Sequence, residues 1–259
     1  MRAWITFAYA LAAYALGVAA LLFFIGFTGN LMVPKSVDAG LSAPWPAALV
    51  VDLALLGLFG LQHSVMARRA FKRWWTRFVP VPAERSTYLV ATSLVLAVVF
   101  ASWLPLPAPM LWRVDAGLGA SVLWGLFGLG WVLVLVSTFL INHFELFGLQ
   151  QAFAALTGRA APEGQFRTPL LYRVVRHPLY LGLLLGLWAA PAMTVGHALF
   201  AAGMSVYILV GIVFEERDLI HQFGDRYRAY RERVGMLLPR LPRLLRVAGR
   251  VKPSARAPT

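Results

Sequence analysis

Long apolar runs separated by short polar segments dominate the chain. Apolar stretches cover residues 4–27, 47–66, 87–104 and 118–141, and two further runs follow at 178–190 and 195–214. A helix needs about 20 predominantly apolar residues to cross the hydrocarbon core of a bilayer. The pattern therefore predicts an all-α fold, a polytopic transmembrane bundle of five to six helices without a soluble domain.

The last two apolar runs predict a helical hairpin. The first limb, residues 178–190, would give roughly 20 Å of helix, which is short for a hydrocarbon core of about 30 Å. A hairpin with one short limb returns the chain to the surface from which it started. We therefore expect His177, at its entry, to lie beside Glu215 and Glu216, at its exit.

A helical stripe follows the hairpin. Leu219, Phe223, Tyr227 and Tyr230 recur at spacings of four, four and three residues, which is the period of one helix face. The spacing predicts a cytoplasmic amphipathic C-terminal helix that lays Tyr227 and Tyr230 back toward the hairpin, where both are candidate cofactor contacts. The alternative is an aromatic belt on a helix that lies on the membrane surface.

Composition and charge agree with a membrane protein. Hydrophobic residues make up 59% of the 259 residues and charged residues 14%, against about 25% charged in soluble domains. The net charge of +13 comes from basic loops at 67–86, 142–176 and the tail, as the positive-inside rule expects. This predicts an integral membrane protein with both termini cytoplasmic, and it argues against nucleic-acid binding. As the location we expect the bacterial inner membrane.

Three regions follow from this organisation. Residues 1–141 hold four spans, residues 142–234 hold a connector, the hairpin and a cofactor-binding module, and residues 235–259 form a basic, partly disordered tail. The chain has no cysteine, which excludes disulfides, thiolate metal sites and a cysteine nucleophile. No ligand spacing for a metal is present, so we expect none.

The segment "RHPLYLG" places Arg176, His177 and Tyr180 where a basic loop enters an apolar run. Arginine can hold a carboxylate bidentately, glutamate can accept from ribose hydroxyls or an ammonium, and tyrosine faces attract cations such as a sulfonium. Together with Glu215 and Glu216 these groups suit S-adenosylmethionine, although a dinucleotide would accept much of the same set.

"RHPLYLG" followed by "EERDLIHQFGDRYRAYRERV" resembles the C-terminal module of the integral-membrane methyltransferases, which include the isoprenylcysteine carboxyl methyltransferases and the phospholipid N-methyltransferases. The resemblance covers residues 173–234. It implies that S-adenosylmethionine is enclosed under the cytoplasmic face. The cofactor contacts that it implies are His177, Pro178, Tyr180, Leu181, Gly182, Glu215 and Glu216.

A narrower resemblance covers most of the chain. "LQHSVMAR", "ERSTY", "STFLINHFELFGLQQ" and "FRTPLLYRVVRHPLYLG" are similar to the methanethiol S-methyltransferases. The resemblance implies methyl transfer from S-adenosylmethionine to methanethiol, giving dimethyl sulfide, in a pocket within the bilayer. No obligate protein partner is evident.

Methyl transfer to a thiol needs a thiolate, held behind the methyl group at about 3–3.5 Å. A free thiol has a pKa of about 8.5, so a base must assist. The candidates, at cytoplasmic helix ends, are Gln62, His63, Asn142, His143 and Glu145, and histidine is the best tuned of these side chains. Each histidine could instead be a satisfied interfacial residue.

Three arginines, Arg85, Arg173 and Arg176, compete for the cofactor carboxylate, and the sequence does not rank them. The glycines of "GLFGLG" (Gly125, Gly128 and Gly130) lack the spacing of a dinucleotide loop, so we expect them to serve helix packing. We interpret His197 as structural and near the far membrane surface.

Other functions remain open at this point. A prenylcysteine carboxylate or a phospholipid amine could be the methyl acceptor, but such large acceptors need a lateral opening between helices. Membrane sterol reductases, which use NADPH, carry a similar "RHPxYxG"-like end. A transporter or scaffold is disfavoured because the chain shows no internal repeat.

Overall fold

The computed structural model describes residues 2–160 and 166–240. Within these residues, the long helices are α1 (Arg2–Gly29), α2 (Trp45–Ala67), α4 (Glu84–Ser102), α5 (Gly117–Ile141) and α9 (Val195–Phe223). All five are long and apolar enough to cross a membrane. The predicted all-α membrane bundle is thereby confirmed.

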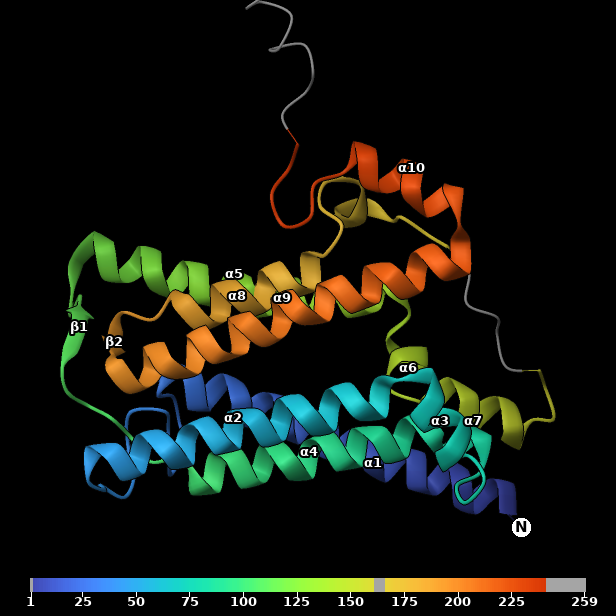
Figure 1. Cartoon of the computed structure of the whole chain (residues 1–259), viewed down its shortest axis with the longest axis horizontal. Helices are drawn as coiled ribbons and strands as arrows, with labels where there is room; N and C mark the ends of the chain where they lie inside the picture. Colours follow the sequence, from blue (N-terminus) through green and yellow to red (C-terminus); the bar gives the residue numbers. More distant parts are fainter. Residues whose placement is uncertain (1, 161–165, 241–259) are drawn as a thin grey trace, which may run out of the picture.

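Shorter elements gather at the two ends of the bundle (Figure 1). At one end lie α3 (Arg69–Trp75), η1 (Val81–Ala83), α6 (His143–Leu146), α7 (Leu149–Leu156), η2 (Leu170–Arg173) and α10 (Asp225–Arg233). The other end carries β1 (Met110–Arg113) and β2 (Ala192–Thr194), which pair antiparallel. The sequence pattern did not predict this ribbon, because both strands are too short to show an alternation.

The long helices form two layers, α1, α2 and α4 in one and α5, α8 and α9 in the other (Figure 1). The first limb of the hairpin is α8 (Pro178–Trp188), only about 16 Å long. Its second limb, α9, continues to Phe223 rather than ending near residue 214. Glu215 and Glu216 therefore lie within a helix and not beyond its end.

Helices α5 and α8 approach each other through glycine. A Cβ on Gly182 would lie 2.5 Å from the carbonyl oxygen of Gly130, and one on Gly130 would lie 2.6 Å from that of Gly182. Close packing is thus confirmed for Gly130. A Cβ on Gly125 or Gly128 would meet nothing within 4 Å, so these two glycines are not required by packing within the chain.

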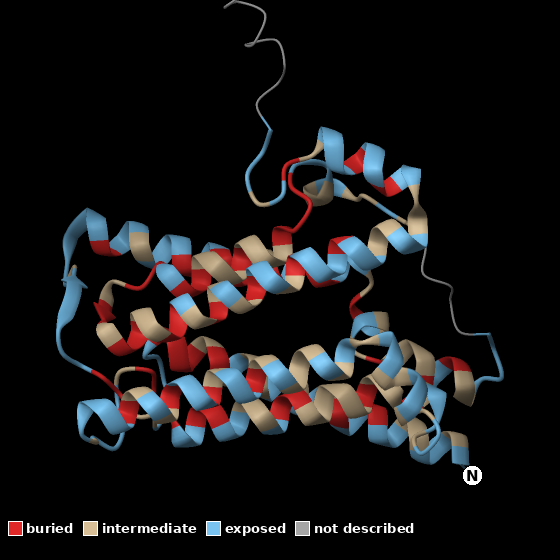
Figure 2. Ribbon diagram, viewed as in Figure 1, coloured by how far each residue is buried: buried red, intermediate tan, exposed pale blue. Residues whose placement is uncertain are grey.

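A buried aromatic cluster joins the two layers. Phe24 of α1 contacts Trp131 of α5 and Phe200 of α9, with ring centroids 5.4 and 5.8 Å apart. Phe27 contacts Phe100 of α4 at 4.9 Å. Such pairs add about 0.5–1.5 kcal/mol each beyond the area they bury. Figure 2 shows buried residues on the inner faces of the layers and in the segment that enters α8.

The ribbon end also holds a buried polar cluster. His197, fully buried, has its Nδ1 3.4 Å from Oδ2 of Asp38, and Nδ2 of Asn30 donates to the same oxygen at 2.7 Å. Thr194 also donates to Asp38. These contacts tie the loop after α1 to the start of α9, which agrees with a structural role for His197 far from the hairpin entry.

The predicted tail falls mostly outside the described residues, since 241–259 are not described. The described part does contact the hairpin entry. The backbone N–H groups of Arg176 and His177 donate to the carbonyls of Gly235 (2.8 Å) and Met236 (3.1 Å), and Val175 forms a parallel bridge with Gly235.

Candidate functional site

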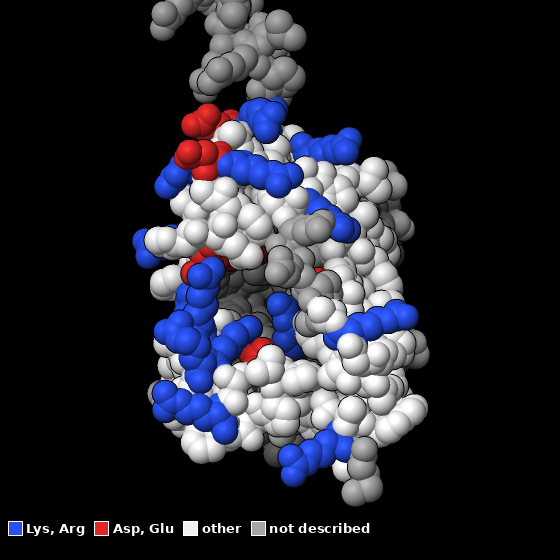
Figure 3. Space-filling view, turned by 90° about the vertical axis from the view of Figure 1, so that its right-hand side faces the viewer, with Lys and Arg blue, Asp and Glu red and all other residues white. Residues whose placement is uncertain are grey.

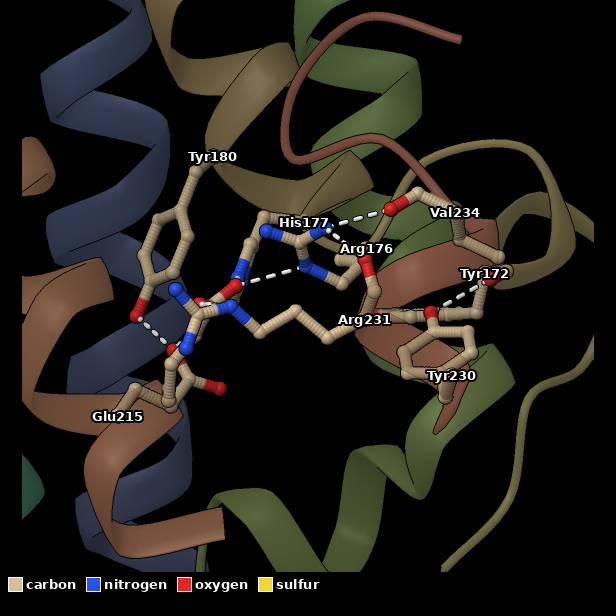
Figure 4. A network of polar contacts seen from close by, with 9 residues as sticks. Tyr172, Arg176, His177, Tyr180, Glu215, Tyr230, Arg231 and Val234 are labelled. Carbon is tan, nitrogen blue, oxygen red and sulfur yellow. Dashed lines mark hydrogen bonds and ion pairs between the residues drawn. The ribbon is translucent and has the colours of Figure 1, made fainter. Parts of the chain in front are cut away.

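The end of α9 lies beside the entry to α8, as the hairpin prediction requires (Figure 4). Nε of Arg176 donates to Oε1 of Glu216 at 2.7 Å, and Nε2 of His177 lies 3.1 Å from the same oxygen. All three side chains are buried. A buried charge is tolerated when it is paired and hydrogen-bonded, so this cluster is a closed and satisfied unit.

Helix α10 completes the pairing of Glu216. Nε of Arg231 lies 3.2 Å from Oε2 of Glu216, so both carboxylate oxygens have cationic partners. Nη1 of Arg176 donates to the carbonyl of Arg231 at 3.1 Å and to that of Val234. Arg176 and Glu216 therefore hold the hairpin and α10 together, and most of their hydrogen-bonding capacity is used within the protein.

Glu215 has a different environment from its neighbour. Tyr180 donates its hydroxyl proton to Oε2 of Glu215 at 2.8 Å, and Nδ1 of His177 lies 3.9 Å from that oxygen. The side chain of Glu215 is 44% exposed, against 8% for Glu216. Of the two acids, Glu215 is the one with a carboxylate accessible from outside the protein.

The two tyrosines of α10 face inward, as the helical stripe predicted. Tyr230 donates to the carbonyl of Tyr172 at 2.5 Å, and Tyr227 is 2% exposed. Burial raises the pKa of Tyr230 to about 12, so its hydroxyl remains a donor. The stripe turns at Gly224, whose φ of +55° lies in the region that favours glycine.

Phe166 supports these tyrosines, with its ring centroid 5.9 Å from Tyr227 and 5.5 Å from Tyr230. The sequence reasoning missed Phe166, because a single aromatic residue in a polar connector has no periodic neighbours. It also missed Arg231, which stands four residues after Tyr227, a spacing that could have placed it on the same helix face.

The structure separates other predicted cofactor contacts from this cluster. Arg173 is exposed and its Nε donates to the carbonyl of Thr168 at 3.3 Å. Arg85, on α4, donates to the carbonyl of Glu145 at 3.3 Å. Gly182 faces α5, as described above. Pro178 begins α8, where its missing N–H costs nothing, and Leu181 follows within the first turn.

His143 is a satisfied histidine. Its Nε2 lies 2.8 Å from the hydroxyl of Tyr14 and its Nδ1 2.8 Å from Oγ1 of Thr138. The ring stacks on Phe139 with centroids 4.1 Å apart. Burial lowers the pKa of His143, so the neutral ring is favoured. Both nitrogens are thus engaged by the protein.

His63 keeps one nitrogen available. Nδ1 lies 3.2 Å from Oγ1 of Thr92, whereas no hydrogen bond joins Nε2 to any residue in the described part of the chain. Phe59, Tyr88 and Tyr207 surround the ring with centroids at 5.3, 4.9 and 5.9 Å. Tyr207 precedes Glu215 on α9 by about 12 Å of helix axis.

Asn142 and Glu145 shape the end of α5. Oδ1 of Asn142 accepts from the backbone N–H of Glu145 at 3.3 Å, and Nδ2 donates to Oε2 of Glu145 at 3.0 Å and to Gln150 at 2.6 Å. This arrangement caps α6. Both side chains are used in turning the chain from α5 toward α7.

The end of the bundle that carries these residues is hollowed. Figure 3 views this end and shows a hollow with Lys and Arg side chains along part of its rim and a few acidic side chains beside it. At one point on this side, the guanidinium of Arg68 lies 4.0 Å from the ring of Phe214 and so links α2 to α9. An anionic group entering from this end would meet a positive potential.

The chain is similar in sequence to several known proteins. The chain is 54% identical to the methanethiol S-methyltransferase of Pseudomonas deceptionensis over 215 residues, 83% of this chain and 82% of that protein. It is 51% identical to the Mycobacterium tuberculosis methanethiol S-methyltransferase over 239 residues, 92% of this chain and 98% of that protein. Nurim from Sus scrofa is 30% identical over 204 residues, 72% of this chain and 77% of that protein. No family model and no solved structure matches the chain.

The fold and the site define a polytopic helical membrane protein with a buried polar site at one end of its bundle. Among such proteins, the chain belongs to the methanethiol S-methyltransferase family.

Proposed function

We propose that this protein methylates methanethiol at the expense of S-adenosylmethionine, releasing dimethyl sulfide and S-adenosylhomocysteine. Its family membership supports this reaction. The observation that carries the proposal is the pair formed by Tyr180 and the accessible carboxylate of Glu215, held beside a buried cluster of Arg176, His177 and Glu216.

The residues present fit S-adenosylmethionine. Glu215 offers an acceptor for ribose hydroxyls or the ammonium group, the ring of Tyr180 suits a sulfonium, and the basic rim of the hollow suits the carboxylate. When bound, this cofactor supplies an electrophilic methyl group. Arg176 and Glu216 position the site, since their contacts join α8, α9 and α10.

We assign the role of base to His63 rather than His143. The neutral imidazole of His63 has an Nε2 without a hydrogen-bond partner among the described residues, and this nitrogen can take the thiol proton while the S–H electron pair stays on sulfur as the thiolate. His143 has no such vacancy, because Tyr14 and Thr138 occupy both nitrogens. Asn142 and Glu145 serve as structural supports, and Arg85 holds the connector through Glu145.

The surroundings of His63 favour a small acceptor. Phe59, Tyr88 and Tyr207 make an aromatic wall against the ring, which excludes water and suits a volatile thiol arriving through the lipid. We place the protein in the bacterial inner membrane with the hollowed, basic end in the cytoplasm, because basic segments gather at that end.

The test uses purified protein in lipid nanodiscs. Binding of S-adenosylhomocysteine and of NADPH is measured calorimetrically, and dimethyl sulfide is measured in the headspace after methanethiol is added. We expect product binding, no NADPH binding, and dimethyl sulfide only with the complete system. Methyl transfer to a prenylcysteine or to phosphatidylethanolamine, with none to methanethiol, would overturn the proposed acceptor. NADPH binding without S-adenosylhomocysteine binding would overturn the whole reaction.

A further inference from the structure

A second pocket is lined by residues of α10 and of the connector at 166–173. It has a volume of about 480 Å³, and four arginines line it, namely Arg167, Arg173, Arg226 and Arg233. Its remaining lining comes from Phe166, Thr168, Pro169 and Tyr230, so no acidic side chain is among the described lining residues. A concave surface with this concentration of positive charge is suited to an anion.

Contacts with described residues hold three of these arginines in place. Nε of Arg173 donates to the carbonyl of Thr168 at 3.3 Å, and Nε of Arg233 donates to that of Ala229 at 3.2 Å. The guanidinium of Arg226 lies 5.2 Å from the ring of Phe166. Within the described residues, none of these three forms an ion pair. Each guanidinium has five N–H donors, so most donors remain for a ligand.

Apolar side chains beside the pocket point to the source of the anion. Leu170 and Val174 flank Arg173 in the chain and are 70% and 51% exposed. At a bilayer surface, exposed aliphatic side chains can contact the acyl chains, while neighbouring arginines contact the lipid phosphates. Arginine also matches phosphate geometry bidentately.

We propose that this pocket binds the phosphate group of an anionic phospholipid. The occupant would also steady the candidate cofactor site, because Tyr230 lines the pocket and donates to the carbonyl of Tyr172. Helix α10 then carries Arg231 against Glu216. Lipid binding at the arginines therefore restrains the helix that completes the buried cluster.

The experiment measures retained lipid by native mass spectrometry of the full-length protein, extracted from nanodiscs of phosphatidylcholine with or without phosphatidylglycerol. The test variant is the double substitution Arg226→Gln and Arg233→Gln. The matched control is Arg228→Gln, on the same helix, whose guanidinium pairs with Asp225 at 2.7 Å on the exposed side. We expect wild type and the control to retain phosphatidylglycerol, and the double variant to bind it about thirtyfold more weakly.

Each other result counts against the proposal. Equal loss in Arg228→Gln would show that surface charge, and not the pocket, attracts the lipid. Full retention by the double variant would remove the arginines from lipid binding. Competition by inorganic phosphate as strong as by phosphatidylglycerol would make the ligand a soluble phosphate. Loss of S-adenosylhomocysteine binding in the double variant, with unchanged thermal unfolding, would assign the pocket to the cofactor instead.

Discussion

Nε2 of His177 and Oε1 of Glu216 lie 3.1 Å apart, although 39 residues separate them in the chain. The short helix α8 and the long helix α9 create this contact by leaving from and returning to the same end of the bundle. Arg176 binds the same carboxylate oxygen, so one acid joins two consecutive basic residues. The following predictions rest on this arrangement and on the different environments of neighbouring residues.

Glu216→Gln should destabilise the protein by about 3–5 kcal/mol, because it leaves the buried guanidinium of Arg176 without its charged partner. Arg231 loses its contact at the same time. The measurement is denaturant unfolding in detergent, with Glu232→Gln, on the exposed side of α10, as the control. Stability equal to that of the control would refute the account of Glu216 as a buried structural acid.

Glu215→Gln should leave unfolding nearly unchanged but weaken S-adenosylhomocysteine binding by about 10- to 100-fold, the loss expected for hydrogen bonds to a charged group. Tyr180→Phe removes the hydroxyl that donates to Glu215 and should give a smaller loss. Calorimetric titration checks both. If Glu215→Gln bound the product as tightly as wild type, Glu215 would not be the ligand contact.

His63→Gln should lower kcat about 10²- to 10⁴-fold while sparing product binding, since a general base contributes in that range. The deficit should shrink at higher pH, where more methanethiol is ionised without help. His143→Gln should mainly reduce stability, because Tyr14 and Thr138 lose their partner. A kcat deficit in His63→Gln that did not change with pH would contradict the role of His63 as the base. A kcat deficit found only in His143→Gln would assign the base to His143 instead.

The hairpin and its polar border could be predicted from the sequence because both depend on local patterns. The short apolar run at 178–190 and the spacing of Tyr227 and Tyr230 carry that information without tertiary detail. The exposure of Glu215 and the burial of Glu216 could not be predicted, because adjacent residues on a helix differ only in the direction they face. Likewise, His63 and His143 have similar sequence settings, and only the partners of their ring nitrogens distinguish them.

Gly182→Ala should destabilise the fold by about 1–3 kcal/mol, the usual cost of overpacking, because its Cβ would lie 2.5 Å from the carbonyl oxygen of Gly130. Gly128→Ala, in α5, meets nothing within 4 Å and should be neutral. Thermal unfolding compares the two. Similar midpoints for both variants would contradict the close crossing of α5 and α8.

Low pH should destabilise the end of the bundle that carries β1 and β2, because Asp38 becomes protonated there. Burial alone would raise its pKa, but hydrogen bonds from His197, Thr194 and Asn30 bring the pKa of Asp38 below its usual value of 3.8. A carboxylate with a lowered folded-state pKa contributes stability above the unfolded value, and this contribution is lost as pH falls through the folded value.

Asp38→Asn should therefore flatten the loss of stability below about pH 4. The measurement is the thermal unfolding midpoint as a function of pH, with Asp115→Asn as the control, since Asp115 is 78% exposed. If the unfolding midpoints of wild type and Asp38→Asn fell equally at low pH, Asp38 would not be the group that titrates.

The pairing of Arg176 and His177 with the backbone of Gly235 and Met236 has a consequence for biosynthesis. These two acceptors are translated after every membrane helix described above. While the ribosome is still making α9 and α10, the entry to α8 has neither its carbonyl partners nor Arg231. The buried cluster beside Glu215 is therefore completed only after residues 231–236 have been synthesised.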